Sequence, residues 1–276
     1  MKNKSRVRQL LREGKIPVGT TLEMGSPELV EIIGNVGYDF VFIDMEHGMF
    51  GIETLLNMIR AAEPYHMDTV VRVAYNEPAL ITQVLDAGSV AVMVPGVCCR
   101  DDVEKAAKAV RYFPEGDRGS SPWTRNTGPC LRDDETWAGH TAESNREVML
   151  WATIEGVEGV ENFRDIITAP GLDVALLGPF DLSQSLGIPG QVNHPKVKEA
   201  FARMAAEAAE QNVLLATVTM IHDTSNEAAV RENADWLACG GRILCSGCDK
   251  GILADRYREI LKYSAECLER NQNTNV

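Results

Sequence analysis

The chain has 276 residues, of which 45% are hydrophobic and 24% charged, as in an ordinary globular protein. Its formal net charge of −13 at pH 7 argues against a general nucleic-acid binder and against a protein that docks on anionic membranes, because both need a positive field. An anionic small substrate is still possible, since a bound cation or an arginine can reverse the potential inside a cleft.

The N-terminal segment MKNKSRVRQLLREGK has no apolar signal core, and no apolar run long enough to cross a membrane follows it. We therefore expect a cytoplasmic protein without a membrane segment. The seven cysteines, such as Cys98 and Cys99, lie mostly in apolar runs and are expected to be reduced thiols. Cys245 and Cys248 have the spacing of half a zinc site, but no second pair or nearby histidine completes it.

Short apolar runs alternate with amphipathic stretches along the whole chain. Because the runs are apolar at consecutive positions, they indicate strands covered on both faces, as in a parallel sheet. The predicted strands are 17–22, 40–44, 69–73, 90–94, 149–155, 174–177, 213–217 and 242–245. Helices are predicted at 27–35, 52–62, 78–87, 101–111, 159–168, 194–211, 224–233 and 250–270, several with proline at the start or glycine after the end.

Eight strands, each followed by a helix, predict an α/β fold with one (β/α)8 TIM barrel domain over residues 1–276. An open doubly wound sheet would show the same alternation, but no G-x-G-x-x-G follows the first predicted strand. The long segment 114–145 is rich in Gly, Ser, Pro and Asp and is predicted to be an active-site loop. Residues 271–276 are predicted to be a disordered tail.

Two acidic residues follow neighbouring predicted strands. In a barrel the active site lies at the C-terminal ends of the strands, where Glu155 and Asp181 should both reach the mouth. Two carboxylates with little else from the protein suit Mg²⁺ or Mn²⁺. Taken singly, Glu155 could form a strand-end salt bridge and Asp181 could cap a helix. Their pairing favours a metal site.

An arginine and a histidine complete the set that the sequence suggests. Arg72 lies between valines in a predicted strand and needs an anionic or carbonyl partner, either a substrate oxygen or a barrel carboxylate. His47 follows the second strand and is suited to proton transfer. The alternative is that it only forms hydrogen bonds within its own loop. Asp86, at the end of the helix that follows the third predicted strand, is a candidate to orient His47. No lysine falls in a predicted strand, so a carbanion would need a Lewis acid rather than a Schiff base.

Several spaced motifs resemble those of a known family. The sequence resembles the class II pyruvate aldolases of the HpcH/HpaI family, which includes 4-hydroxy-2-oxoheptanedioate aldolase, 2-keto-3-deoxy-sugar-acid aldolases and macrophomate synthase relatives. The resemblance runs from about residue 14 to residue 253. The motifs occur in the family's order and are Asp44-Met45-Glu46-His47-Gly48, Val71-Arg72-Val73, Leu85-Asp86-Ala87-Gly88, Val92-Met93-Val94-Pro95, Arg118-Gly119, Ile154-Glu155 and Gly178-Pro179-Phe180-Asp181-Leu182-Ser183.

The resemblance implies a divalent-metal-dependent aldolase that makes or breaks 4-hydroxy-2-oxo acids through a pyruvate enolate. Its metal would be Mg²⁺, with Mn²⁺ or Co²⁺ as alternatives, and its partners a 2-oxo acid of the pyruvate or oxaloacetate type and an aldehyde. Oxaloacetate decarboxylation is a second expected activity. The family also suggests a homo-oligomer, either a hexamer or a trimer.

The same resemblance assigns roles to individual residues. It implies metal ligands at Glu155 and Asp181, and it places Asp44 just outside the ligands, where it would hold metal-bound water. The roles of the remaining residues are carbonyl stabilisation by Arg72, acid–base catalysis by His47 with Asp86, and substrate carboxylate binding by backbone amides near Gly178 and Pro179.

The sequence departs from the family pattern at two places. Phe180 stands where many members have alanine and is expected to narrow the substrate pocket, and residues 20–23 replace a common aromatic in the first strand. The alternatives are a citramalyl- or malyl-CoA type lyase, a non-catalytic 2-oxo-acid-binding protein, and a phosphate-binding barrel. The first would need a basic site for the CoA phosphates, and no Lys/Arg cluster is evident. The third would need a glycine-rich phosphate loop, for which only Cys239-Gly240-Gly241 is a candidate.

Overall fold

The computed structural model describes residues 4–128, 134–211, 213–219 and 227–274. Eight parallel strands form a closed barrel in chain order, with β8 pairing back to β1, and the predicted (β/α)8 fold is thereby confirmed. The strands are β1 (Val18–Leu22), β2 (Phe40–Asp44), β3 (Asp68–Arg72), β4 (Ala91–Val94), β5 (Met149–Ile154), β6 (Val174–Leu177), β7 (Leu214–Thr219) and β8 (Ile243–Cys248).

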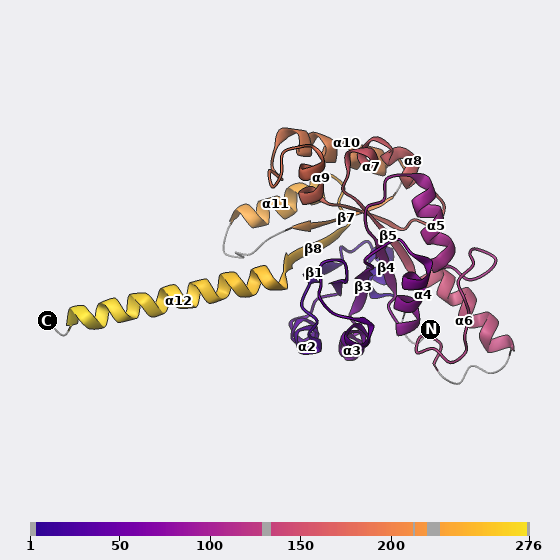
Figure 1. Ribbon diagram of the computed structural model, residues 1–276, viewed down its shortest axis with the longest axis horizontal. Helices are drawn as coiled ribbons and strands as arrows, with labels where there is room; N and C mark the ends of the chain where they lie inside the picture. Colours follow the sequence, from indigo (N-terminus) through magenta and orange to yellow (C-terminus); the bar gives the residue numbers. More distant parts are fainter. Residues whose placement is uncertain (1–3, 129–133, 212, 220–226, 275–276) are drawn as a thin grey trace.

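Helices surround the barrel (Figure 1). They are α1 (Arg6–Arg12), α2 (Pro27–Val36), α3 (Ile52–Ala62), the short 3-10 helix η1 (Glu63–Tyr65), α4 (Pro78–Ala87), α5 (Arg100–Val110), α6 (Asp134–Glu147), α7 (Val157–Glu161), α8 (Phe163–Ile167), α9 (Pro179–Ser185), α10 (Pro195–Gln211), α11 (Glu227–Ala238) and α12 (Asp249–Thr274). The helix predicted at 159–168 is divided between α7 and α8. Residues 224–226 of the helix predicted at 224–233 lie outside the described residues.

Local signals explain where the early helices begin and end. The Ser26 side chain accepts a hydrogen bond from the backbone N–H of Leu29, and Pro27 occupies the first turn of α2. Gly37 ends α2 in the left-handed conformation, with φ of 103°, and Gly88 ends α4 in the same way, with φ of 112°. Glycine adopts this conformation without the steric cost of a Cβ atom, so each helix stops at a defined residue and the chain turns into the next strand.

Alternate side chains of each strand fill the barrel interior, while the others pack against the helices. Phe40 and Trp151 belong to this interior cluster, with ring centroids 5.9 Å apart. A Cβ atom at Gly19 would lie 2.4 Å from the Phe40 ring, so the ring requires a glycine there. At the C-terminal ends of β2 and β3, the inward positions are occupied by the charged residues Asp44 and Arg72 rather than by apolar ones. This is the end of a barrel at which active sites lie.

Helix α1, which the sequence analysis did not predict, lies at the other end of the barrel. Its Val7 side chain belongs to the interior cluster. Asp68, at the start of β3, accepts hydrogen bonds from the Ser5 hydroxyl at 2.8 Å and the Val7 amide at 2.9 Å. Burial raises the pKa of Asp68 to about 6, although these hydrogen bonds oppose the effect. The N-terminal segment is thus tied to the first residue of a barrel strand.

The segment 114–145 is not the active-site loop that the sequence predicted. It follows α5 and precedes β5, and such connections lie at the N-terminal ends of barrel strands, away from the mouth. Accordingly, Arg118 pairs with Asp86 at the end of α4, at 2.7 Å, and Arg125 pairs with Glu63 at 2.5 Å. Its last part forms most of α6, and residues 129–133 lie outside the described residues. Length and composition suggested a functional loop, but position in the βα order places the segment at the opposite end.

Helix α12 projects away from the barrel as a long rod (Figure 1). It continues to residue 274, so the predicted disordered tail begins as helix, and residues 275–276 lie outside the described residues. Among the described residues, no helix combines the length and apolar character needed to span a bilayer. The six cysteines in the described part are free thiols.

Candidate active site

Asp44 organises the loop that follows β2. Its side chain is buried, and its Oδ1 atom accepts hydrogen bonds from the backbone N–H groups of Glu46 at 2.9 Å and His47 at 3.4 Å. The same carboxylate accepts two hydrogen bonds from Arg72 on the neighbouring strand, from Nε at 2.9 Å and from one terminal nitrogen at 2.6 Å. One carboxylate therefore fixes both the loop carrying His47 and the guanidinium of Arg72.

Arg72 extends from the last residue of β3 into a cluster of acids. Besides Asp44, it approaches Glu46, whose Oε2 atom lies 3.0 Å from the other terminal nitrogen. The guanidinium also lies over the Phe42 ring, 5.5 Å from its centroid. Burial lowers the pKa of Arg72, but Asp44 outweighs that effect and the pKa is raised. Contacts with the described residues occupy at most three of the five N–H donors of Arg72, which leaves two that could bind a substrate oxygen.

Pairing with a barrel carboxylate, the structural alternative for Arg72, is therefore observed. This pairing occupies only two of the N–H donors of the guanidinium group. The two-point hydrogen bond to Asp44 holds the plane of the guanidinium in one orientation, which is the arrangement that presents its remaining donors to a bound oxyanion.

Glu155 follows β5 and is held by backbone. Its Oε1 atom accepts a hydrogen bond from the Gly96 amide at 2.8 Å, whereas Oε2 has no hydrogen-bond donor in the described part of the chain. A Cβ atom at Gly178 would lie 2.8 Å from Cβ and 3.0 Å from Oε2 of Glu155, so a glycine is needed beside this carboxylate. Burial raises the pKa of Glu155, as do the charges of Asp181 and Glu46, against the opposing effects of the Gly96 hydrogen bond and Arg72.

Asp181 and Phe180 lie in the first turn of α9, whose N-cap is Gly178. Asp181 is therefore the third residue of the helix and not its cap. Phe180 is 48% exposed, and the neighbouring Asp181 is exposed as well, whereas Glu155 is partly buried.

Backbone amides near Gly178 and Pro179 are predicted to bind a substrate carboxylate, but neither of these two residues offers a free N–H group. The Gly178 N–H donates to the Ile154 carbonyl at 3.1 Å, and proline has no N–H. The next two amides of the turn, those of Phe180 and Asp181, have no partner among the described residues.

His47 lies at the mouth with 57% of its side chain exposed, and its Nε2 atom is 3.9 Å from Glu46 Oε2. The predicted orientation of His47 by Asp86 does not occur within one chain. Asp86 is at the C-terminal end of α4, which returns to the far end of the barrel, and its carboxylate accepts a hydrogen bond from the buried Arg118 at 2.7 Å. Sequence order placed Asp86 near strand three but did not show that a helix length separates it from the mouth.

The residues fit a hard divalent cation. Glu155 and Asp181 follow neighbouring strands, and the charge of Asp181 contributes to raising the pKa of Glu155. Glu155 also offers one oxygen that no donor in the described part of the chain occupies. Carboxylate oxygens with open positions for water or substrate are the usual protein contribution to a Mg²⁺ site. A cation there would offset the repulsion among three neighbouring acids, Glu155, Asp181 and Glu46.

The sequence analysis assigned no role to two residues of this site, Glu46 and Gly96. Burial raises the pKa of Glu46, and its Oε2 atom lies within ion-pair distance of Arg72 but makes no well-aligned hydrogen bond to any described residue. Its place in the Asp44–Gly48 motif was the available signal. Gly96 acts through its amide, which no side-chain pattern reveals.

Comparisons with known proteins identify the family that this chain matches. Residues 21–241 match the family described as HpcH/HpaI aldolase/citrate lyase. A hydroxypyruvate/pyruvate aldolase of Sagittula stellata is 30% identical over 230 residues, covering 82% of this chain and 89% of the relative. A 4-hydroxy-2-oxo-heptane-1,7-dioate aldolase of Shigella flexneri is 31% identical over 203 residues, covering 72% and 73%.

A solved structure shows the same fold over nearly the whole chain. The HpcH/HpaI aldolase from Desulfitobacterium hafniense superposes with a TM-score of 0.86 at 27% identity, covering 94% of this chain and 96% of that one. The family resemblance drawn from the spaced motifs is confirmed by these matches.

Proposed function

The chain belongs to the HpcH/HpaI aldolase/citrate lyase family and is an enzyme of the aldolase type, and from this premise we propose that it is a divalent-metal-dependent lyase of 4-hydroxy-2-oxo acids. The products would be a pyruvate-type 2-oxo acid and an aldehyde, and the reverse reaction would be aldol addition. The observation that carries the proposal is the placement of Arg72 at the end of β3, Glu155 directly after β5 and Asp181 in the first turn after β6, all at the same end of the barrel.

Glu155 and Asp181 are the proposed metal ligands. A bound Mg²⁺, or Mn²⁺ or Co²⁺ in its place, supplies a Lewis acid that draws electron density from the 2-oxo acid. The protein holds Glu155 in position through the Gly96 amide and keeps the space beside its free oxygen open with Gly178.

Arg72 and His47 are the proposed catalytic residues. The remaining N–H donors of Arg72, oriented by Asp44, stabilise the negative charge that develops on the 2-oxo oxygen as the C3–C4 bond breaks. His47, exposed at the mouth, removes the proton of the 4-hydroxyl group. Asp44 acts as a positioning residue for both, through its bonds to Arg72 and to the His47 amide. Loss of CO₂ from oxaloacetate develops charge on the same oxygen and is a proposed second activity.

A substrate panel with metal removal tests this function. Pyruvate release from several 4-hydroxy-2-oxo acids and from oxaloacetate is measured after EDTA treatment, and again after Mg²⁺, Mn²⁺ or Co²⁺ is restored. We expect release of pyruvate from at least one 4-hydroxy-2-oxo acid, its loss with EDTA and its return with metal. Full turnover in EDTA would contradict metal dependence. No pyruvate from any substrate, together with 2-oxo acid binding, would favour the non-catalytic alternative.

Phe180 is the proposed determinant of substrate size. It is half exposed, and it immediately precedes the proposed ligand Asp181 in the first turn of α9. Phe180→Ala should widen the pocket without altering the metal ligands, so kcat/KM for bulky aldehydes should rise relative to that for small ones, by about tenfold for one or two additional buried methylene groups. The measurement is kcat/KM across an aldehyde series in the addition direction. An unchanged preference order would exclude Phe180 from substrate selection.

The proposed assembly is a homo-oligomer, of which a hexamer or trimer is expected. Support comes from α12, which projects from the barrel with exposed apolar side chains at helical spacing, among them Tyr257, Ile260, Leu261 and Leu268. A second copy of the chain is the proposed cover for this face. Sedimentation at micromolar concentration tests it, and a purely monomeric species would contradict it.

A further inference from the structure

Two adjacent thiols lie at the start of α5, in the loop that follows β4. Cys98 and Cys99 are both half-buried free thiols, and Cys99 is the N-cap residue of the helix. They lie at the same end of the barrel as Glu155, because the loop also contains Gly96, whose amide holds that carboxylate. Neither thiol belongs to the proposed aldolase site.

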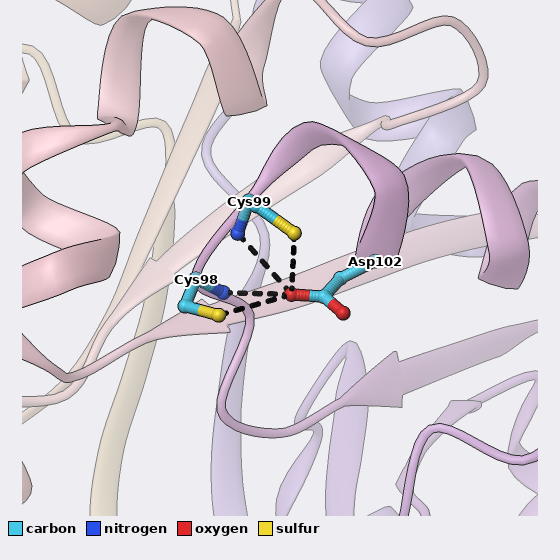
Figure 2. A group of neighbouring side chains, drawn as sticks. All are labelled: Cys98, Cys99 and Asp102. Carbon is cyan, nitrogen blue, oxygen red and sulfur yellow. Dashed lines mark hydrogen bonds between the residues drawn. The ribbon is translucent and has the colours of Figure 1, made fainter.

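Both thiols converge on one carboxylate oxygen. Figure 2 shows the sulfur and amide nitrogen of each cysteine directed at the same oxygen of Asp102. The two Sγ···Oδ2 distances are each 3.3 Å, and the amides donate to the same atom at 3.0 Å for Cys98 and 3.2 Å for Cys99. The two sulfurs and the oxygen all lie within 4.8 Å of one another.

This spacing suits a tetrahedral thiophilic cation. With usual Zn–S and Zn–O bond lengths, tetrahedral coordination places each sulfur about 3.5 Å from the carboxylate oxygen. The observed distances of 3.3 Å require only a small adjustment. Two thiolates and a carboxylate provide three ligands, which leaves a fourth position for water, as in open zinc sites. Thiolate ligands also discriminate against Mg²⁺, which prefers oxygen.

Surrounding contacts hold the three side chains in place. The carbonyl of Cys98 accepts a hydrogen bond from the Asn162 side chain at 2.9 Å, and the carbonyl of Asp102 accepts one from the Asn76 side chain at 2.9 Å. The amide of Val97 donates to the Thr153 carbonyl on β5 at 3.1 Å. The site is thus built on neighbouring βα units rather than on a free loop, which lowers the cost of ordering ligands around an ion.

We propose that Cys98, Cys99 and Asp102 form a second cation site, selective for a thiophilic divalent ion such as Zn²⁺ or Cd²⁺ and separate from the oxygen-ligand site at Glu155 and Asp181. Binding of one ion forms two metal–sulfur bonds and one metal–oxygen bond and releases two protons from the thiols. Electrons are not transferred.

The test is a Cd²⁺ titration of the reduced full-length protein in excess Mg²⁺, followed by the ultraviolet thiolate-to-cadmium charge-transfer absorption. Carboxylate-bound Cd²⁺ does not give this band, so failure of the aldolase proposal would leave the readout intact. We expect saturation at one Cd²⁺ per chain, displacement by Zn²⁺, no displacement by Mg²⁺, and release of two protons per ion.

Serine variants and a matched control locate the site. Cys98→Ser and Cys99→Ser keep a hydroxyl donor to Asp102, and serine is a good N-cap, so α5 should persist. Each should weaken Cd²⁺ binding by at least about 100-fold, as expected when a ligand carrying several kcal/mol of zinc-type affinity is lost. Asp102→Asn should weaken it while leaving both thiols. The control, Cys239→Ser with Cys267→Ser, removes two exposed cysteines and should leave affinity unchanged.

Unchanged affinity in Cys98→Ser and Cys99→Ser would overturn the proposal, as would loss of the band in the control or displacement of Cd²⁺ by Mg²⁺. Circular dichroism and thermal unfolding of each variant separate loss of ligands from loss of the fold. If Asp102→Asn unfolds α5, the two serine variants still decide the question.

Discussion

Replacing Glu155 with glutamine is expected to lower turnover by at least about 1000-fold, equivalent to about 4 kcal/mol of transition-state stabilisation. Glutamine has the same size and can still accept the Gly96 hydrogen bond, but its neutral oxygen is a much weaker ligand for a divalent cation. The fold should not suffer. Because burial and neighbouring acids raise the pKa of Glu155, its ionised form destabilises the metal-free fold at neutral pH, and the Glu155→Gln variant should have an unchanged or higher Tm in EDTA.

The measurements are kcat with saturating Mg²⁺ and thermal unfolding in EDTA. Glu158→Gln is a matched control, since Glu158 is an exposed acid in the adjoining helix α7. It should leave both quantities unchanged. A variant at Glu155 that retains near-normal turnover would remove this residue from the proposed metal site, whereas a large fall in Tm would assign it a structural role instead.

Replacing Arg72 with alanine is expected to lower kcat by at least about 100- to 1000-fold, because a single oxyanion donor contributes about 3 kcal/mol in water-excluded sites. The free energy of unfolding of the Arg72→Ala variant should fall as well. Asp44 is buried and accepts two hydrogen bonds from Arg72, so it would lose its positively charged partner. Glu46 would lose its ion pair with the same guanidinium. Removing one partner of a buried pair typically costs about 3–5 kcal/mol. Kinetics on the folded fraction and urea unfolding give the two effects separately.

A second buried arginine provides the control for this variant. Arg111 pairs with Asp173 at 2.9 Å and is as well buried as Arg72, but this pair lies apart from the candidate active site. Arg111→Ala should lower the free energy of unfolding while leaving kcat of the folded enzyme unchanged. Equal losses of kcat in the two variants would show that a weakened fold, and not the loss of an oxyanion donor, explains the effect. Near-normal kcat in Arg72→Ala would exclude Arg72 from catalysis.

The strands could be predicted from sequence because their signal is local. Runs such as Phe40–Asp44 are apolar at consecutive positions, and burial on both faces follows from that pattern alone. The helix α6 could not be found in the same way, since its weakly amphipathic sequence has no clear apolar stripe. The position predicted for segment 114–145 is wrong because composition does not indicate which end of the barrel a connection occupies.

The candidate site, too, could be predicted only in part from the sequence. Glu155, Asp181, Arg72 and His47 all lie at the mouth, as expected for residues that follow or end barrel strands. Asp86 does not, because a residue at the end of a helix lies at the opposite end from one at the end of a strand. Contacts made by the backbone, such as the hydrogen bond from the Gly96 amide to Glu155, cannot be predicted from the side-chain types in the sequence. The two hydrogen bonds between Arg72 and Asp44 could not be predicted without the strand register, which places these residues side by side.

Binding of Mn²⁺ tests most directly whether the carboxylates after β5 and β6 hold the activating cation. Electron paramagnetic resonance of free Mn²⁺, titrated with the chain in the presence and absence of pyruvate, gives stoichiometry and affinity. One ion should bind per chain, more tightly with pyruvate, and the double variant Glu155→Gln, Asp181→Asn should bind at least about 100-fold more weakly. Mn²⁺ bound equally well by the double variant, with turnover retained, would contradict the proposed metal site.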